Sequence, residues 1–156
     1  MFHSILKLTK PKIIISDQIA KRIGDDGKAI YHIKVVNLRK KFVVNVMPYL
    51  DLAHSENGPG GTILRLKALN VDARKIPFID PYDHRDTDSK YAVRFEIHEN
   101  LDEVWQNDTT QFLRLLIFCV DEFSGSGKFF EKKYYQRSCI VSGKFKTGKS
   151  VEVIPS

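Results

Sequence analysis

The chain has 156 residues, enough for one domain with a hydrophobic core and too few for two. Hydrophobic residues make up 42% and charged residues 28%, a globular composition that excludes a disordered chain. The 25 Lys and Arg residues outnumber the 19 Asp and Glu residues, and the formal charge of +6 suits an anionic partner without identifying one. No apolar stretch reaches the roughly 18 residues that span a bilayer. We expect an N-terminal lead-in over residues 1–10 and a single domain over residues 11–156.

The cysteine content predicts the compartment. Cys119 and Cys139 are too few for a disulfide framework, and free thiols are typical of a reducing environment. The first residues lack the charged start and apolar core of a signal peptide. We therefore expect a cytoplasmic protein.

Alternation of apolar and polar residues, the pattern of a half-buried strand, dominates the sequence. It is clearest over residues 90–98 and again over 29–38, where Asp25-Asp26-Gly27 precedes the run as a hairpin-turn signal. The predicted strands cover residues 13–16, 29–38, 42–52, 63–69, 90–98, 112–120, 128–135, 138–145 and 151–154. Many short strands separated by turns predict an all-β sandwich.

Two places interrupt this pattern. Pro48 lies inside a predicted strand and has no N–H group to donate, so we expect an edge strand or a bulge there. Residues 101–106 predict a short helix, with Asn100 as its cap and Glu103 reaching back to the cap amide. At most one or two short helices are therefore expected.

The segment Gly143-Lys144-Phe145-Lys146-Thr147-Gly148-Lys149-Ser150 fits the phosphate-loop pattern G-x-x-x-x-G-K-S. That loop needs a following helix, whose N-terminal amides hold the phosphates. Only Val151 to Ser156 follow, and they alternate like a strand and include Pro155. We therefore interpret the segment as a hairpin between the last two strands, without a bound nucleotide.

The sequence offers weak candidates for a metal site. Asp80, Asp83, His84, Asp86 and Asp88 cluster, but the order of an EF-hand is absent, and a solvated polar loop is the favoured interpretation. The remaining histidines are scattered and show no zinc-binding spacing. We expect no metal and no cofactor.

The sequence also shows no recognisable set of catalytic residues. There is no G-x-S-x-G elbow, and Cys119 lies in an apolar run typical of an inert thiol. Cys139 follows Arg137 and is better placed for reactivity, but no base is marked to activate it. We do not expect an enzyme.

Basic residues suggest two anionic partners. Lys7, Lys10 and Lys12 alternate with apolar residues, so this segment either rests on an anionic membrane surface or only leads into the first strand. A single-stranded nucleic acid is the alternative, because aromatic and basic residues interleave over residues 128–135. The residues concerned are Lys128, Phe129, Phe130, Lys132, Lys133, Tyr134 and Tyr135.

Several motifs occur in the order seen in a known family. They are Lys10-Pro11-Lys12-Ile13-Ile14-Ile15-Ser16, Ala20, Asp26-Gly27, Val35-Val36-Asn37-Leu38-Arg39-Lys40, His98-Glu99-Asn100-Leu101-Asp102-Glu103 and Gly143-Lys144-Phe145. Together they resemble the cytoplasmic domain of inward-rectifier potassium channels. The last motif lacks the Trp of the family, and the fifth carries one extra residue.

This resemblance implies an immunoglobulin-like antiparallel β-sandwich that regulates a pore from the inner face of a membrane and assembles as a tetramer. The family's lipid-sensing cations correspond to Lys10 and Lys12. The pore helices have no counterpart in this sequence, so we expect a regulatory or interaction domain without a pore of its own. It would bind itself, a protein partner or an anionic membrane surface, with nucleic-acid binding as the alternative.

Overall fold

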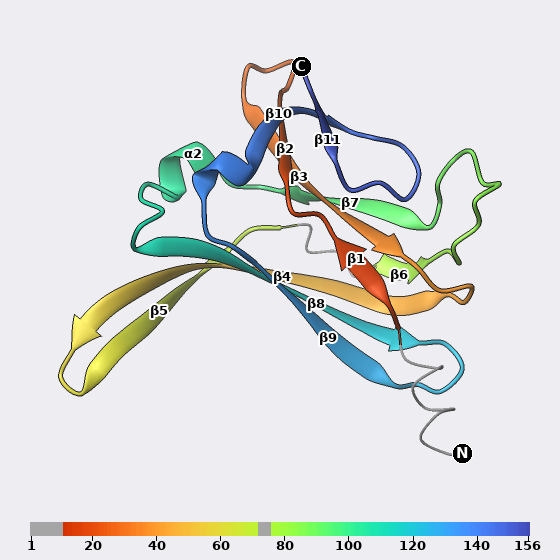
Figure 1. The fold of residues 1–156 in the computed structure, drawn as a ribbon, viewed down its shortest axis with the longest axis horizontal. Helices are drawn as coiled ribbons and strands as arrows, with labels where there is room; N and C mark the ends of the chain where they lie inside the picture. Colours follow the sequence, from red (N-terminus) through yellow and green to blue (C-terminus); the bar gives the residue numbers. More distant parts are fainter. Residues whose placement is uncertain (1–10, 72–75) are drawn as a thin grey trace.

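The chain forms two β-sheets that pack face to face, as Figure 1 shows for the computed structural model, which describes residues 11–71 and 76–156. The six-stranded sheet contains β1 (Ile13–Ile15), β2 (Ile19–Ile23), β3 (Ala29–Asn37), β7 (Ala92–Ile97), β10 (Ile140–Phe145) and β11 (Val153–Pro155). The five-stranded sheet contains β4 (Val43–Gly58), β5 (Gly61–Leu69), β6 (Ile76–Ile79), β8 (Gln111–Asp121) and β9 (Gly127–Tyr134). The described helices are the short α2 (Leu101–Val104) and a 3-10 turn, η1 (Arg137–Cys139). The predicted all-β sandwich with short helices is confirmed.

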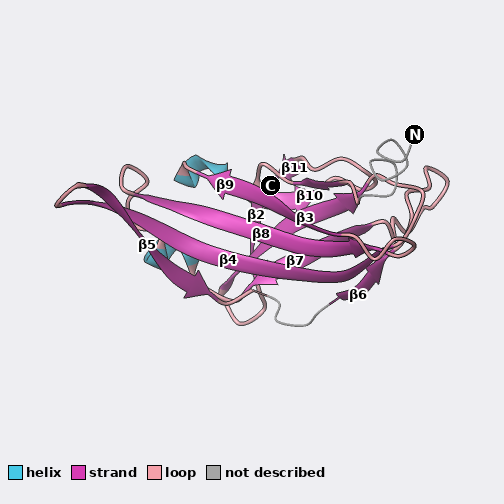
Figure 2. Ribbon diagram, turned by 90° about the horizontal axis from the view of Figure 1, so that it is seen from below, coloured by secondary structure: helices cyan, strands magenta, loops and turns pink. Residues whose placement is uncertain are grey.

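The longest strands organise the two sheets. In the six-stranded sheet, β3 pairs with β1 and β2 along one edge and with β7 along the other. In the five-stranded sheet, β4 pairs with β8 on one side and with β5 and β6 on the other. The β4–β5 hairpin extends beyond the rest of the molecule in both views (Figures 1 and 2).

One pair departs from the expected antiparallel arrangement. Strand β10 runs parallel to β2, with Ile140 opposite Ile19 and Ser142 opposite Lys21. Parallel strands require a long connection rather than a tight turn, and nearly the whole chain lies between these two. The pairing therefore brings the last part of the chain against its beginning.

The core lies between the sheets and follows the alternation that predicted the strands. Tyr31, Ile33 and Phe95 from one sheet meet Leu115 and Ile117 from the other, and none has measurable exposure. Burying an aliphatic or aromatic side chain contributes about 1.5–3 kcal/mol to the free energy of unfolding. This two-sided packing is what fixes the outward residues of each sheet in place.

All nine predicted strands are present, although several boundaries move by a few residues. Strands β2 and β6 were not predicted. Pro48 was expected on an edge strand or a bulge, and the edge interpretation is wrong because β4 is central. The bulge is confirmed immediately before it, where the register with β8 shifts between Val44 and Met47.

The predicted position of the helix cap is confirmed at Asn100, but the expected capping by its side chain is wrong. Asn100 precedes α2, but its side chain makes no capping hydrogen bond. Its amide oxygen instead accepts a hydrogen bond of 3.1 Å from the hydroxyl of Tyr31 on β3. The helix also ends at Val104, two residues earlier than predicted.

Candidate functional site

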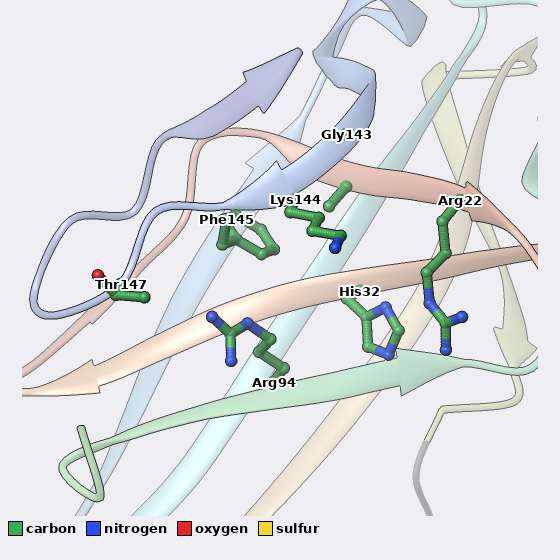
Figure 3. A pocket seen from close by; sticks show the side chains of 8 residues that line it. Arg22, His32, Arg94, Gly143, Lys144, Phe145 and Thr147 are labelled. Carbon is green, nitrogen blue, oxygen red and sulfur yellow. The ribbon is translucent and has the colours of Figure 1, made fainter. Parts of the chain in front are cut away.

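A pocket of about 380 Å³ opens on the outward side of the six-stranded sheet. Figure 3 shows the side chains of Arg22, His32, Arg94 and Lys144 gathered around it. Ala20, Gly143, Phe145 and Thr147 complete its lining. We call it the cationic pocket, because three of its eight lining residues carry a permanent positive charge and none is an acid.

Cross-strand register places these groups together. On β3, Tyr31 and Ile33 face the core, so His32 and Lys34 face outward. The backbone positions of Ala20 on β2 and Arg94 on β7 pair with those of His32 and Lys34, respectively. The cations therefore come from strands that are distant in sequence and adjacent in space.

Gly143, which lines the pocket, allows β11 to pack closely against β10. Its φ of 152° lies in the region that favours glycine. A Cβ atom at this position would lie 2.0 Å from the carbonyl oxygen of Ile154 on β11. Any larger residue would therefore push β11 away from β10, the strand that carries Lys144 and Phe145.

Lys34 lies beside the pocket but does not line it, because the turn between β10 and β11 covers it. Its side chain is 1% exposed. Its ammonium group donates hydrogen bonds of 2.7 Å to the carbonyl oxygens of Lys146, Gly148 and Ser150. Burial, and secondarily the positive charge of Arg94, lower the pKa of Lys34 to about 8. Burial, the larger cause, disfavours a charge of either sign, whereas the contribution of Arg94 shows that this guanidinium places a positive potential beside Lys34.

The same turn carries the phosphate-loop pattern, and its geometry is the reverse of a phosphate site. A phosphate loop presents amide N–H groups to its ligand. Here three carbonyl oxygens point inward and hold the ammonium of Lys34. The predicted hairpin between the last two strands is confirmed by the antiparallel pairing of Lys144 with Ile154.

A larger cleft of about 970 Å³ lies on the same sheet and has the opposite character. Its acidic lining residues are Asp26, Glu96, Glu99, Asp102 and Glu103. Asp102 accepts hydrogen bonds of 2.5 Å from both Lys21 and Tyr31. Burial alone would raise the pKa of Asp102, but these two hydrogen bonds outweigh it and lower the pKa. Asp102 is thus held as a carboxylate within a structural network.

The lysines predicted to contact lipid are only partly described. Lys12 is exposed immediately before β1, and its carbonyl oxygen accepts a hydrogen bond of 3.0 Å from the amide of Leu38. Lys7 and Lys10 lie outside the described residues. Lys12 does not line the cationic pocket.

The acidic loop after β6 binds its own backbone. Asp83 accepts a hydrogen bond of 3.0 Å from the amide of Arg85, and Asp86 accepts one of 3.0 Å from the amide of Asp88. In the parts of the chain that the structure describes, no three metal-ligating side chains gather in one place. The loop therefore matches the favoured interpretation of a polar turn.

Neither cysteine has the character of a nucleophile. Burial raises the pKa of Cys119 to about 12 and that of Cys139 to about 11. Cys139 is the better placed of the two, as expected, because it is only partly buried and its pKa is raised less, but burial still holds this pKa above the ordinary value of a thiol. Reactive thiols have a lowered pKa instead.

The aromatic and basic residues of β9 do not share one face. Tyr134 is buried and donates a hydrogen bond of 2.7 Å to the carbonyl oxygen of Ser16. Phe129 and Tyr135 are exposed on the outward side, whereas Lys132 turns inward to pair with Asp17. The outward side of β9 keeps Phe129, Lys133 and Tyr135, three of the seven residues considered for stacking with single-stranded nucleic acid, and this alternative stays a prediction.

No protein-family model matches this chain, and no curated protein matches it. Within residues 11–71 and 76–156, no helix is long and apolar enough to cross a membrane.

Sequence reasoning missed this pocket. Arg94 is an outward residue of a predicted strand, but Arg22 lies in the unpredicted β2. The parallel pairing that adds Lys144 has no local sequence signal. The alternation around Arg94 and around His32 pointed to this face of the sheet.

Proposed function

We propose that this protein is a non-catalytic interaction domain whose cationic pocket binds a phosphate-type anion. The observation that carries the proposal is the gathering of Arg22, Arg94 and Lys144 around a concavity with no lining carboxylate. Guanidinium groups bind phosphate oxygens in bidentate fashion, and an ammonium adds a mobile point charge. The volume of about 380 Å³ suits a small ligand or a headgroup.

The chemistry of the pocket favours binding over reaction. Guanidinium and ammonium groups stay protonated near neutral pH, so they attract an anion without exchanging protons with it. The hydroxyl of Thr147 and the ring of His32 add hydrogen-bonding groups to the same lining. A bound phosphate would therefore be oriented and released unchanged.

We further propose that the anion is a lipid headgroup and that the domain is regulatory, at the inner face of a membrane. The support is the resemblance of residues 11–52 to the cytoplasmic domain of inward-rectifier potassium channels, together with the all-β sandwich. The formal charge of +6 favours the same kind of surface.

Two titrations test this proposal and separate free phosphate from lipid. The first uses inorganic pyrophosphate, and the second uses phosphatidylcholine vesicles with and without phosphatidylglycerol. We expect the triple variant Arg22→Gln, Arg94→Gln, Lys144→Gln to lose at least about tenfold in affinity for both anionic probes. The control variant Lys40→Gln, Lys67→Gln, Lys90→Gln removes the same charge from exposed positions outside the pocket.

The two variants give opposite results if the pocket is the site. The control should keep most of the wild-type affinity, because its lysines contribute only to the long-range field. If both variants lost the same affinity for the anionic probes, binding would depend on the overall surface charge and not on the pocket. This result would contradict the proposal. Binding of pyrophosphate without binding of anionic vesicles would retain the pocket and reject the lipid headgroup.

A further inference from the structure

Strand β5 forms one edge of the five-stranded sheet, and one of its two sides is open. Its residues, Gly61–Leu69, pair with β4, and no other described strand lies along them in either view (Figures 1 and 2). The pairing with β4 continues without a register shift from Leu69 to Gly61. An unpaired edge strand is a template for a further strand, because half of its backbone groups have no partner in the sheet.

The hydrogen bonding of β4 identifies which groups of β5 face the open edge. Ser55, the partner of Leu64, donates its amide to the carbonyl oxygen of Thr110 at 3.0 Å. This amide therefore points away from β5, so Ser55 and Leu64 form an antiparallel pair without mutual hydrogen bonds. In such a pair the N–H and C=O groups of both residues point outward, and the pattern repeats at every second residue. The backbone groups of Leu64 and Leu66 thus face the open edge.

Strand β5 lacks most of the features that prevent strand addition. It spans nine residues and contains no proline, and its pairing shows no bulge. All of its residues except Leu69 are exposed, and the large apolar side chains among them are 41% exposed at Ile63 and 47% at both Leu64 and Leu66. An added strand would cover part of this apolar surface and pair the open backbone groups.

The two faces of β5 differ in chemistry. Leu64 and Leu66 lie on one face, because side chains alternate along a strand. The other face carries Arg65 and Lys67. Arg65 pairs with Glu56 on β4 at 2.7 Å but stays 66% exposed, and Lys67 has no ion pair with a described residue. Side chains of paired strands lie directly beside one another. A matching strand would therefore alternate apolar residues, opposite the leucines, with acidic residues, opposite the cations.

The same cations disfavour a second copy of this chain at the edge. A two-fold axis at Arg65, which gives the longest overlap, sets this residue against its own copy. An axis at Leu66 sets Arg65 against Lys67 twice, and like charges directly opposite each other are destabilising. An axis at Leu64 shortens the overlap and leaves the two Arg65 side chains as diagonal neighbours. The cations thus act against self-pairing and leave an acidic strand acceptable.

We propose that the open edge of β5 binds an extended segment of a partner protein by strand addition, and that acidic and apolar residues alternate in this segment. Backbone hydrogen bonds at Leu64 and Leu66 supply the affinity, and Arg65 and Lys67 select for acidic residues. The hairpin extends beyond the rest of the molecule, so the partner can approach the edge (Figure 1). The edge belongs to the other sheet from the cationic pocket and does not depend on it.

A labelled synthetic peptide of alternating valine and glutamate residues, as long as β5, tests the proposal by fluorescence anisotropy. We expect saturable binding to wild type with a dissociation constant below about 1 mM. The same peptide with lysine in place of glutamate should bind at least about tenfold more weakly, because it meets cations on β5. No binding of the glutamate peptide, or equal binding of the two peptides, would overturn the proposal.

A proline substitution tests the backbone pairing. Leu64→Pro removes an amide that faces the open edge and leaves the hydrogen bonds with β4 in place, so the variant should fold and bind the glutamate peptide at least about tenfold more weakly. Leu64→Thr also loses the apolar side chain but keeps the amide, and it should bind at least about fivefold more tightly than Leu64→Pro. Circular dichroism checks that both variants are folded. Equal affinities in the two folded variants would contradict strand addition.

A charge reversal tests the selection for acidic residues. Arg65→Glu with Lys67→Glu should prefer the lysine peptide, whereas the control Lys40→Glu with Lys90→Glu makes the same charge change at exposed positions away from β5 and should keep the wild-type preference. The pocket variant Arg22→Gln, Arg94→Gln, Lys144→Gln should bind the glutamate peptide within about threefold of wild type. An equal loss in either of these proteins would mean that the peptide binds elsewhere. A wild-type dimer that Leu64→Pro dissociates would replace the partner protein by a second copy.

Discussion

Lys34 and Arg94 are direct cross-strand partners on β3 and β7, but they have opposite environments. Lys34 is enclosed by three carbonyl oxygens, and Arg94 is exposed in the lining of the cationic pocket. Each positive charge disfavours the other, and this repulsion contributes to the lowered pKa of Lys34. The pair therefore connects the stability of the last hairpin with the electrostatics of the candidate site.

Removing the ammonium of Lys34 should destabilise the fold. In Lys34→Met the carbonyl oxygens of the turn lose their donor, at a cost of about 2–4 kcal/mol in the free energy of unfolding. Urea denaturation measures this loss. Lys144→Met, an exposed control on β10, should change the free energy by less than about 0.5 kcal/mol. Equal values for the two variants would mean that the turn does not depend on Lys34.

The lowered pKa of Lys34 also predicts a pH dependence. The pKa of this lysine is about 8 in the folded chain and has its ordinary value of 10.5 in the unfolded chain, so between these values the unfolded chain binds more protons. This group therefore makes the fold more stable as the pH rises above about 8. The two buried thiols have a raised pKa, so they make the fold less stable as the pH rises above 9.0, the ordinary pKa of a cysteine. The effect of Lys34 is therefore measured below pH 9.0.

The measurement compares wild type with Lys34→Met by urea denaturation at several pH values between about 7 and 9. We expect the stability difference between them to grow with pH in this interval. A difference that shrinks would show that Lys34 keeps an ordinary or raised pKa in the fold.

The alternation of the sequence was sufficient to predict the sandwich, and the reason is visible in β3. Tyr31, Ile33 and Val35 occupy one side of that strand and enter the core as predicted. Strand β2 escaped prediction because its sequence Ile19-Ala20-Lys21-Arg22-Ile23 does not alternate. Strand β6 escaped because it spans four residues and includes Pro77.

The candidate site depended on information that no local pattern contains. Lys34 belongs to the polar side of an alternating strand, and its burial follows from the turn that covers it more than a hundred residues later. Arg22 and Lys144 meet because β10 pairs in parallel with β2, an arrangement set by the whole topology. Sequence periodicity reports which side of a strand faces the core, but not which distant segment lies over the other side.

Lys149, the lysine that would bind phosphate in a phosphate loop, does not line the cationic pocket and should contribute nothing to anion binding. Its turn directs carbonyl oxygens inward, and the following strand β11 provides no helix dipole. We expect Lys149→Ala to bind pyrophosphate with wild-type affinity in a calorimetric titration, in contrast with Arg94→Gln. A tenfold loss of affinity for pyrophosphate in Lys149→Ala would show that this turn belongs to the binding site.

The N-terminal lysines give a separate prediction about membranes. If Lys7, Lys10 and Lys12 contact lipid, they contribute roughly 3 kcal/mol, at about 1 kcal/mol for each cation. Sedimentation with anionic vesicles should then show weaker binding by the variant in which all three are changed to Gln. Salt at about 0.5 M should abolish the difference, because it screens exposed charges within a few ångströms. Identical binding by the two proteins would identify the segment as only a lead-in to β1.

The most direct test of the cationic pocket is the pKa of Lys34 itself, followed by NMR of its side-chain nitrogen during titration with inorganic pyrophosphate. Burial is the larger cause of the lowered pKa of Lys34 and repulsion by Arg94 the smaller, and an anion bound beside Arg94 offsets this repulsion, so we predict that saturation raises the pKa above its value of about 8. The triple variant Arg22→Gln, Arg94→Gln, Lys144→Gln should show no further rise on addition of pyrophosphate. A pKa of Lys34 that stays the same in wild type at saturating pyrophosphate would contradict the assignment of this pocket as the anion site.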